Sequence, residues 1–329
     1  MTGPEPRPGR EVYRDLLAGL MASDERLVCL DSDTGLFSSV DFGPGAARYV
    51  NVGIAEQNMM GVAAGLARAG RVPVVNTMAT FAVTRALESI KVDIALTNLP
   101  VRIVATNGGL AAGHLGPTHH SLEDLAIMRT LPNMTVVVPA DADQTLALFV
   151  AALDTPGPVY FRLGRGATPG LPAAAPAVRL GVAQVVRHTD RARVTIVACG
   201  PYPVLAALDA AAELAADGTT VTVLNMHTVK PLDVAALVAA AEFSDVVVTA
   251  EEHWATGGLG SAVAEALAEL APVRVVRVAA AERFFPMAGG QQWLLAQAGV
   301  DRDRIVAAAR GVLSGEPAWS VAGRHRATR

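Results

Sequence analysis

Cysteine is scarce in this chain, and long apolar runs are absent. Only Cys29 and Cys199 occur among the 329 residues, each inside an apolar, strand-like segment. Two such residues offer no disulfide framework, and buried free thiols in a reducing cytoplasm are the simplest interpretation. No stretch approaches the roughly 20 uncharged residues that a membrane span requires. We therefore expect a cytoplasmic protein without a membrane segment.

Charge is modest in amount and nearly balanced in sign. The formal net charge is -4 and charged residues make up 18% of the chain, which gives no electrostatic reason to expect nucleic acid or an anionic membrane as a partner. Apolar residues make up 51%, a proportion that fits a well-buried α/β protein. A chain of 329 residues exceeds one ordinary core and suggests two domains.

Short β-branched runs alternate with longer helical stretches along the chain. This alternation predicts an α/β protein of mostly parallel sheets with helices on both faces. The expected strands are 28–30, 73–75, 101–104, 135–138, 159–161, 194–198, 221–224, 246–249 and 273–276. The expected helices lie near 11–21, 55–69, 81–97, 121–130, 142–153 and 201–216.

A segment rich in proline and glycine follows the fifth expected strand and divides the chain. We expect a first domain over residues 11–165, a linker over 166–186 and a smaller α/β domain over 187–315. Residues 1–10 are expected to form a flexible lead-in, and residues 316–329 a solvated tail.

The segment Asn51–Asn58 places Glu56 just inside the start of an apolar helix rich in small residues. Such a helix packs closely against another backbone, so we expect Glu56 to be buried at an interface. A buried carboxylate must be paired or protonated, because removing a bare charge from water is costly. An acid in the first helical turn can equally serve only as a cap, and the spacing alone leaves both interpretations open.

A series of short motifs follows along the rest of the chain. They are Thr80–Arg85, Gly116–His120, Leu122–Leu125, Pro132–Met134, Val138–Asp141, Val159–Arg162, Asn225–Leu232, Ala250–His253 and Gly257–Gly260. Together with Asn51–Asn58, and in this order, they resemble the C-terminal half of transketolase in its split, two-gene form. The resemblance extends from about Arg10 to about Ala309. It implies a thiamine-diphosphate-binding fold followed by the smaller transketolase C-terminal domain.

The resemblance implies contacts to the cofactor thiamine diphosphate for four residues. Glu56 would be the catalytic acid that hydrogen-bonds N1' of the aminopyrimidine, and burial suits this role because it raises the pKa of a glutamate. Phe81 would stack on the pyrimidine, although a Phe at a strand-to-helix junction can also be ordinary core. Asp33 and Ile54 would lie near the cofactor, and the alternative for Asp33 is a turn residue.

The resemblance also implies contacts to the substrate. His119 would be a catalytic residue facing the donor carbonyl, where it could donate a hydrogen bond to a developing oxyanion or shuttle a proton. Arg162, Arg165 and Arg10 would bind a substrate phosphate, and the alignment does not decide between Arg162 and Arg165. Arg85 is a fourth candidate for the phosphate. Each arginine could equally be a surface charge.

Two positions depart from the transketolase pattern. Leu115 replaces an aspartate that recognises a sugar hydroxyl, and Asn107 replaces a histidine that touches the sugar phosphate. Leucine cannot accept a hydrogen bond, so a hydroxyl would lose its partner at this point. We therefore expect a non-standard substrate that is less hydroxylated or carries a different terminal group.

The Gly-Asp-Gly tripeptide with which transketolases hold Mg²⁺ is missing from the sequence, and no acidic cluster replaces it. The resemblance therefore implies no metal ligands on this chain. It implies instead a partner, the N-terminal diphosphate-binding subunit, in an α2β2 heterotetramer with thiamine diphosphate and Mg²⁺ at the subunit interface.

The expected activity is transfer of a two-carbon ketol unit from a ketose donor to an aldehyde acceptor. One alternative is a 2-oxo acid decarboxylating enzyme, such as a dehydrogenase β subunit or an acyloin or deoxyketose synthase. Another is a non-catalytic subunit that only stabilises its partner. Residues expected to have solvent or structural roles are His120, His227, Lys230, His253 and Gly257–Gly260.

Overall fold

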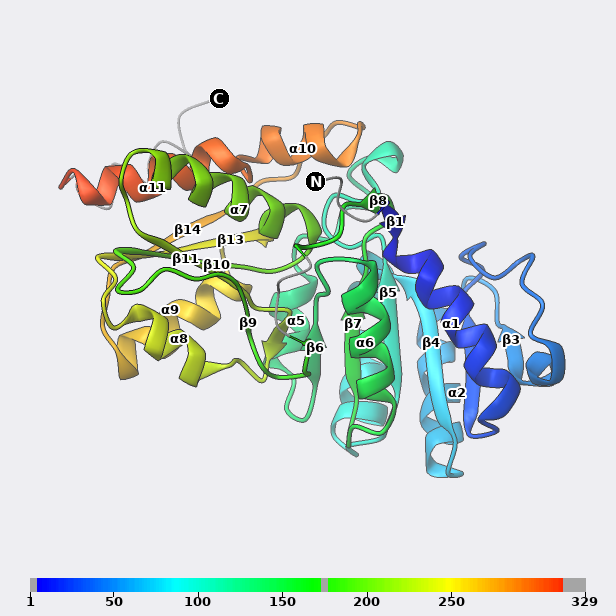
Figure 1. Cartoon of the computed structure of the whole chain (residues 1–329). Coiled ribbons are helices and arrows are strands. Elements are labelled where there is room, and N and C mark those ends of the chain that lie inside the picture. Colours follow the sequence, from blue (N-terminus) through cyan, green and yellow to red (C-terminus); the bar gives the residue numbers. More distant parts are fainter. Residues whose placement is uncertain (1–4, 173–176, 316–329) are drawn as a thin grey trace.

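The computed structural model describes residues 5–172 and 177–315 (Figure 1). The tail expected over 316–329, and parts of the expected lead-in and linker, lie outside the described residues.

The larger sheet has seven strands in the order β12-β6-β7-β5-β4-β2-β3. Every pairing in it is parallel except that of β12 with β6. The expectation of a mostly parallel sheet is therefore confirmed. Its strands are β2 (Leu27–Asp31), β3 (Tyr49–Asn51), β4 (Val72–Met78), β5 (Arg102–Thr106), β6 (Thr135–Val137), β7 (Val159–Arg162) and β12 (Thr228–Lys230).

Helices cover both faces of this sheet. Helices α1 (Gly9–Ser23) and α6 (Ala142–Leu153) bury their apolar side chains in one cluster with Val74. Helix α2 (Glu56–Arg68) packs in another cluster with Val75. Neighbouring residues of a strand point to opposite faces, so the two clusters lie on opposite sides of the sheet.

The other described helices of this half are α3 (Ala79–Arg85), α4 (Leu87–Ser89), the π-helix Ile90–Ala95 and α5 (Asp124–Thr130). Two short 3-10 helices cover Gly43–Arg48 and Gly113–Leu115.

The start of the chain is ordered earlier than expected. Strand β1 (Arg7–Pro8) pairs with β8 (Ala167–Thr168), and α1 begins at Gly9. The prediction of a flexible lead-in is therefore wrong for Arg7 to Arg10, because this segment is held by the chain that returns after β7.

The smaller sheet has five strands in the order β14-β13-β10-β11-β9, with β9 antiparallel to β11. In Figure 1, α7 and α11 lie on one side of it and α8 and α9 on the other. No helix within the described ranges is both long and apolar enough to cross a bilayer. The elements are β9 (Gln184–Arg187), β10 (Val194–Ala198), β11 (Val221–Asn225), β13 (Val246–Trp254), β14 (Val275–Ala280), α7 (Pro201–Ala216), α8 (Val234–Ala241), α9 (Leu259–Leu270), α10 (Gln291–Ala298) and α11 (Arg302–Leu313).

Buried polar contacts join the two halves. The Arg162 Nε lies 3.1 Å from the Asp124 Oδ2, and the two side chains are only 5% and 0% exposed. Arg162 also donates to the backbone oxygens of Ser121 (3.0 Å) and Glu252 (2.7 Å). The Glu252 carboxylate accepts a 2.7 Å hydrogen bond from the Leu110 N–H, and burial raises the pKa of this carboxyl group. Arg162 thus links the first sheet to β13 of the second.

Removing the Arg162 guanidinium should destabilise the protein strongly. We expect Arg162→Ala to lower the free energy of unfolding by about 3–5 kcal/mol, because Asp124 would keep a buried charge without its partner. Urea denaturation would measure the loss. Arg165→Ala, three positions further on at an exposed site, is the matched control and should cost about 0.5 kcal/mol or less. Equal losses for the two variants would contradict the structural role of Arg162.

Candidate functional site

The candidate site residues gather at one edge of the seven-stranded sheet. Because β2, β4, β5 and β7 are parallel, the segments that follow them emerge at the same edge, where α/β proteins usually bind ligands. Asp33 follows β2, Phe81 follows β4, His119 lies in the loop after β5, and Arg165 follows β7. The topology therefore brings together residues that are far apart in sequence.

Glu56 is the first residue of α2, and its side chain is 2% exposed. The expectation that it is buried is confirmed. Its Oε2 accepts a 2.7 Å hydrogen bond from Nη1 of Arg85, the last residue of α3. The partial positive charge at the helix start also favours a carboxylate at this position. Glu56 is thus both buried and paired, as the cost of burying a charge requires.

Aromatic rings adjoin this ion pair. The Arg85 Cζ lies 4.3 Å from the centroid of the Phe81 ring, and the His119 ring meets Phe81 edge-on with centroids 5.3 Å apart. The Thr118 hydroxyl lies 2.9 Å from the His119 Nδ1. In this structure Arg85, which was the fourth candidate for the phosphate, contacts the carboxylate and the ring. We call Glu56, Phe81, Arg85 and His119 the acid–aromatic group.

A second group, Arg10, His114 and Arg165, carries its positive charge on two guanidinium side chains. Burial and the positive charge of Arg165 lower the pKa of the Arg10 guanidinium. Desolvation and the charges of Arg165, His119 and Arg10 lower the pKa of the His114 imidazole. His119 thus contacts Phe81 of the first group and acts electrostatically on His114 of the second. We call Arg10, His114 and Arg165 the cationic group.

Sequence reasoning did not propose His114 as a site residue. The available signal was its position immediately before Leu115, one of the two departures from the family pattern. A titratable side chain beside such a departure is a candidate for contact with the substrate.

The structure corrects the prediction for Arg162. Its guanidinium is buried against Asp124 and backbone carbonyls, so it is not available to a substrate. Arg165, in contrast, is exposed. The two arginines thus differ in the direction of their side chains, which the sequence does not reveal, and only Arg165 is accessible to a substrate.

The structure also describes four further residues that were predicted to contact the cofactor or the substrate. Ile54 is 73% exposed and Leu115 is 46% exposed. Asp33 has a φ of 61°, and its Oδ1 accepts a 3.0 Å hydrogen bond from the Asn51 Nδ2. Asn107 is buried with a φ of 59°, and within the described part of the chain its Oδ1 has no hydrogen-bond partner. Asn107 could therefore offer an acceptor to a bound molecule.

The histidines and the lysine that we expected to be structural make internal contacts. Burial lowers the pKa of His227 to about 4, and Lys230 donates to the backbone oxygen of Arg129 at 2.8 Å. His253 accepts a hydrogen bond from the Ala126 N–H across the domain contact. His120 is buried instead of solvated, so the expectation for its environment is wrong.

An internal carboxylate already occupies the anion-binding position at the glycine-rich start of α9. The Glu251 carboxylate accepts hydrogen bonds of 2.6 and 2.7 Å from the N–H groups of Leu259 and Gly260. A Cβ on Gly258 would lie 2.1 Å from the Glu251 Oε2. Gly257–Gly260 therefore serves close packing around an internal acid.

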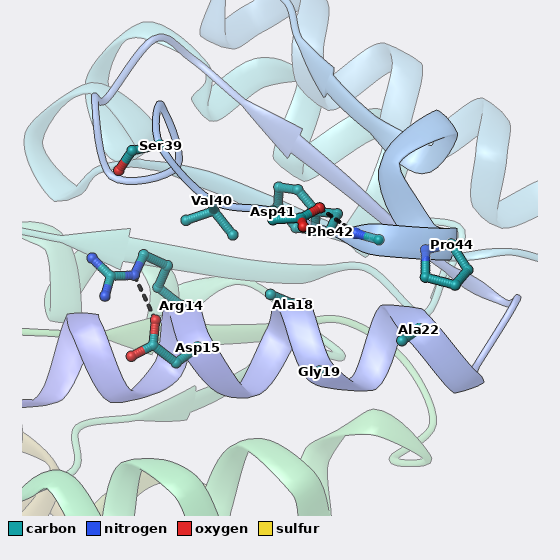
Figure 2. Close-up of a pocket in the computed structure, with 11 residues that line it drawn as sticks. Arg14, Asp15, Ala18, Gly19, Ala22, Ser39, Val40, Asp41, Phe42 and Pro44 are labelled. Atoms are coloured by element: carbon teal, nitrogen blue, oxygen red, sulfur yellow. Dashed lines mark hydrogen bonds and ion pairs between the residues drawn. The ribbon is translucent and has the colours of Figure 1, made fainter.

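A surface cleft of about 570 Å³ lies between α1 and the segment Ser39–Pro44 (Figure 2). Arg14 and Asp15 form an ion pair on its wall. No member of the acid–aromatic group or of the cationic group lines it. The chemically equipped site is thus elsewhere, at the carboxyl edge of the sheet.

Comparisons with known proteins agree with this division of the chain. The family described as "Transketolase, pyrimidine binding domain" matches residues 6–170, and "Transketolase, C-terminal domain" matches residues 181–305. The chain is 41% identical to 6-deoxy-6-sulfo-D-fructose transketolase subunit SqwH of Clostridium sp. (strain MSTE9), over 92% of this chain and 94% of that protein. It is 40% identical to one of the subunits of apulose-4-phosphate transketolase of Phocaeicola vulgatus, over 82% of this chain and 86% of that protein.

A solved structure gives the same result. It is described as a split gene transketolase, inactive beta4 tetramer, and it matches with a TM-score of 0.84 and 40% identity. The match covers 95% of this chain and 100% of that chain. With both domains matched in order, the chain belongs to the transketolase family, of which it contains the pyrimidine-binding and C-terminal domains.

Proposed function

We propose that this chain is the pyrimidine-binding subunit of a split transketolase that transfers a two-carbon ketol unit from a ketose with an anionic terminal group to an aldehyde. The observation that carries the proposal is the continuity of the site. Buried Glu56 is linked through Arg85 to Phe81, Phe81 contacts His119, and the charge of His119 acts on His114 of the cationic group.

The residues of the acid–aromatic group fit one half of the family's cofactor. Thiamine diphosphate supplies a nucleophilic carbon and an electron sink for cleavage of the donor C–C bond. Glu56 offers a desolvated carboxyl group to a ring nitrogen, and Phe81 offers a face for stacking. Asp33 and exposed Ile54 would border the same ring. The described residues contain no cluster of three or more acidic, His or Cys side chains that could hold a metal, so we assign Mg²⁺ and the diphosphate to the partner.

His119 is suited to act on the substrate carbonyl. When the Thr118 hydroxyl donates to Nδ1 of His119, the ring proton lies on Nε2. From there it can be donated to an oxygen that gains negative charge as the donor reacts. Thr118 would thus select the useful tautomer.

The cationic group indicates an anionic end on the substrate. Arg10 and Arg165 offer planar guanidinium donors that match a tetrahedral oxyanion, and His114 gains a proton more easily once an anion is bound. The two relatives are named for a sulfonated fructose and for apulose 4-phosphate. A phosphate or a sulfonate shares the required chemistry. Leu115 offers no acceptor to a sugar hydroxyl beside this group, which supports a non-standard substrate.

Exposed apolar side chains in the same half of the chain as Glu56 are suited to the partner subunit. Ile54 and Leu96 are 73% and 74% exposed, and Val62 of α2 is also exposed. A Cβ on Gly61 or Gly65 would meet nothing within 4 Å, so another backbone could approach α2 closely. The solved β4 tetramer is described as inactive, which supports an α2β2 heterotetramer as the active form. Free buried thiols at both cysteines are compatible with a cytoplasmic location.

Reconstitution tests the proposal directly. The chain alone should show no turnover, whereas adding a diphosphate-binding transketolase subunit from the same organism, thiamine diphosphate and Mg²⁺ should give ketol transfer. The reason is that the ligands for the metal are expected on the other polypeptide. A donor and acceptor screen read by product mass measures the activity. Turnover by the chain alone would contradict the assignment of Mg²⁺ and the diphosphate to the partner subunit. CO₂ release from pyruvate without ketol transfer would favour the decarboxylating alternative.

Glu56→Gln should reduce kcat of the reconstituted pair by about 100-fold or more, because the amide cannot exchange a proton with the ring nitrogen. Assembly, measured by size-exclusion chromatography with light scattering, should be unchanged. Glu88→Gln, at an exposed position of α4, is the control. Full activity in Glu56→Gln would point instead to a scaffold subunit.

Arg165→Ala should raise KM for a ketose phosphate or sulfonate by roughly 10–100-fold with little change in kcat, since the loss is a charge-assisted hydrogen bond to a group remote from the reacting carbon. Steady-state kinetics on an anionic and a neutral ketose would show it. The neutral donor should be insensitive to the substitution. Arg179→Ala, an exposed arginine outside the cationic group, should leave both donors unaffected, and an equal effect on both donors for Arg165→Ala would argue against an anion site.

A further inference from the structure

Arg85 makes two contacts at once within the acid–aromatic group. Its Nη1 donates to the Glu56 Oε2 at 2.7 Å, and its Cζ lies 4.3 Å from the centre of the Phe81 ring. A planar, positively charged group thus lies over an aromatic face while donating an N–H to a buried carboxylate. An aminopyrimidine bound as described under the proposed function would make the same two contacts.

We propose that Arg85 is a displaceable substitute for the pyrimidine, which neutralises Glu56 and covers Phe81 until the cofactor arrives. This inference rests on the proposed function. The guanidinium and the pyrimidine cannot share the Glu56 Oε2 and one face of Phe81 at the same time. Cofactor binding must therefore move Arg85 out of the site.

The surroundings of the pair leave Arg85, and not Glu56, free to move. The side chain of Arg85 is 44% exposed, whereas that of Glu56 is 2% exposed. Water can solvate the guanidinium as soon as it leaves, because the last residue of α3 borders solvent. Glu56 has no such route, since its helix is packed on the sheet through Met59, Met60 and Ala63.

The pair also has a function in the empty subunit. Without Arg85, Glu56 would be a buried charge with no counter-ion, which is costly. An ion pair with one exposed member has a small net free energy because water competes for the cation. The contact is therefore strong enough to order the empty site and weak enough to be exchanged.

Calorimetric titration of the reconstituted pair with thiamine diphosphate in excess Mg²⁺ tests the proposal. Arg85→Ala should lower Kd by up to about fivefold, because the competing contact is removed. The advantage over the unchanged pair should shrink at high salt, which already screens the ion pair. Arg85→Gln should tighten binding less, because the amide can still occupy the site without charge. If Arg85→Ala fails to assemble, Arg85→Gln decides the question.

Arg193→Ala is the matched control, since it removes an ion pair with Asp245 of the same 2.7 Å length in the distant second domain. It should leave Kd unchanged. An equal or higher Kd in both Arg85 variants would overturn the inference, as would a crystal structure of the loaded pair with Arg85 still on Glu56.

Failure of this inference can be told apart from failure of the proposed function. If the unchanged pair binds the cofactor and Glu56→Ala weakens that binding, the proposed function stands whatever the Arg85 variants do. If the unchanged pair binds no cofactor, both proposals are wrong.

Discussion

The site depends on the burial of one carboxylate. Glu56 is the first residue of a helix that packs against the sheet, so water cannot solvate the Glu56 carboxylate. The carboxylate then needs a partner, and the surrounding elements are arranged to provide one. Helix α3 ends at Arg85, close enough to donate, and presents Phe81 one turn earlier. The acid, the ring and the cation are thus consequences of the same packing.

The second domain contributes by holding the loop that carries His114 and His119. Glu252 of β13 accepts from the Leu110 N–H, and the Gly289 N–H donates to the Gly113 oxygen at 3.0 Å. The fit is close, because a Cβ on Gly113 would come within 2.3 Å of the Leu294 side chain. A loop fixed from outside in this way can present histidines with little freedom, although it has no regular structure of its own beyond a short 3-10 turn.

Much of this architecture follows from sequence pattern. Both α6 and α7 have the predicted bounds, and the central strands lie where continuous apolar runs predicted them, since a parallel strand is buried on both faces. The short strands β1, β3, β8, β9 and β12 were missed. All except β3 pair in antiparallel fashion, and β12 joins the sheet of the other domain, which no local periodicity encodes.

Within the site, the direction of the side chains could not be predicted from the sequence. Arg162 and Arg165 are three residues apart and chemically alike, yet one is buried in the domain contact and the other faces solvent. Arg85 was named only as a fourth phosphate candidate, and its contact with Glu56 was missed because that contact depends on two helices meeting. Motif order located the acid, the ring and His119, whereas tertiary contacts decided which cation serves which group.

Strand β12 has a consequence for engineering this chain. It comes from the second half of the sequence but completes the edge of the first sheet through β6. Cutting the gene at the domain boundary would strip that edge and leave unpaired backbone groups open to self-association. Chimaeras built by exchanging whole C-terminal halves would therefore have to match β6 as well as the contact between the domains.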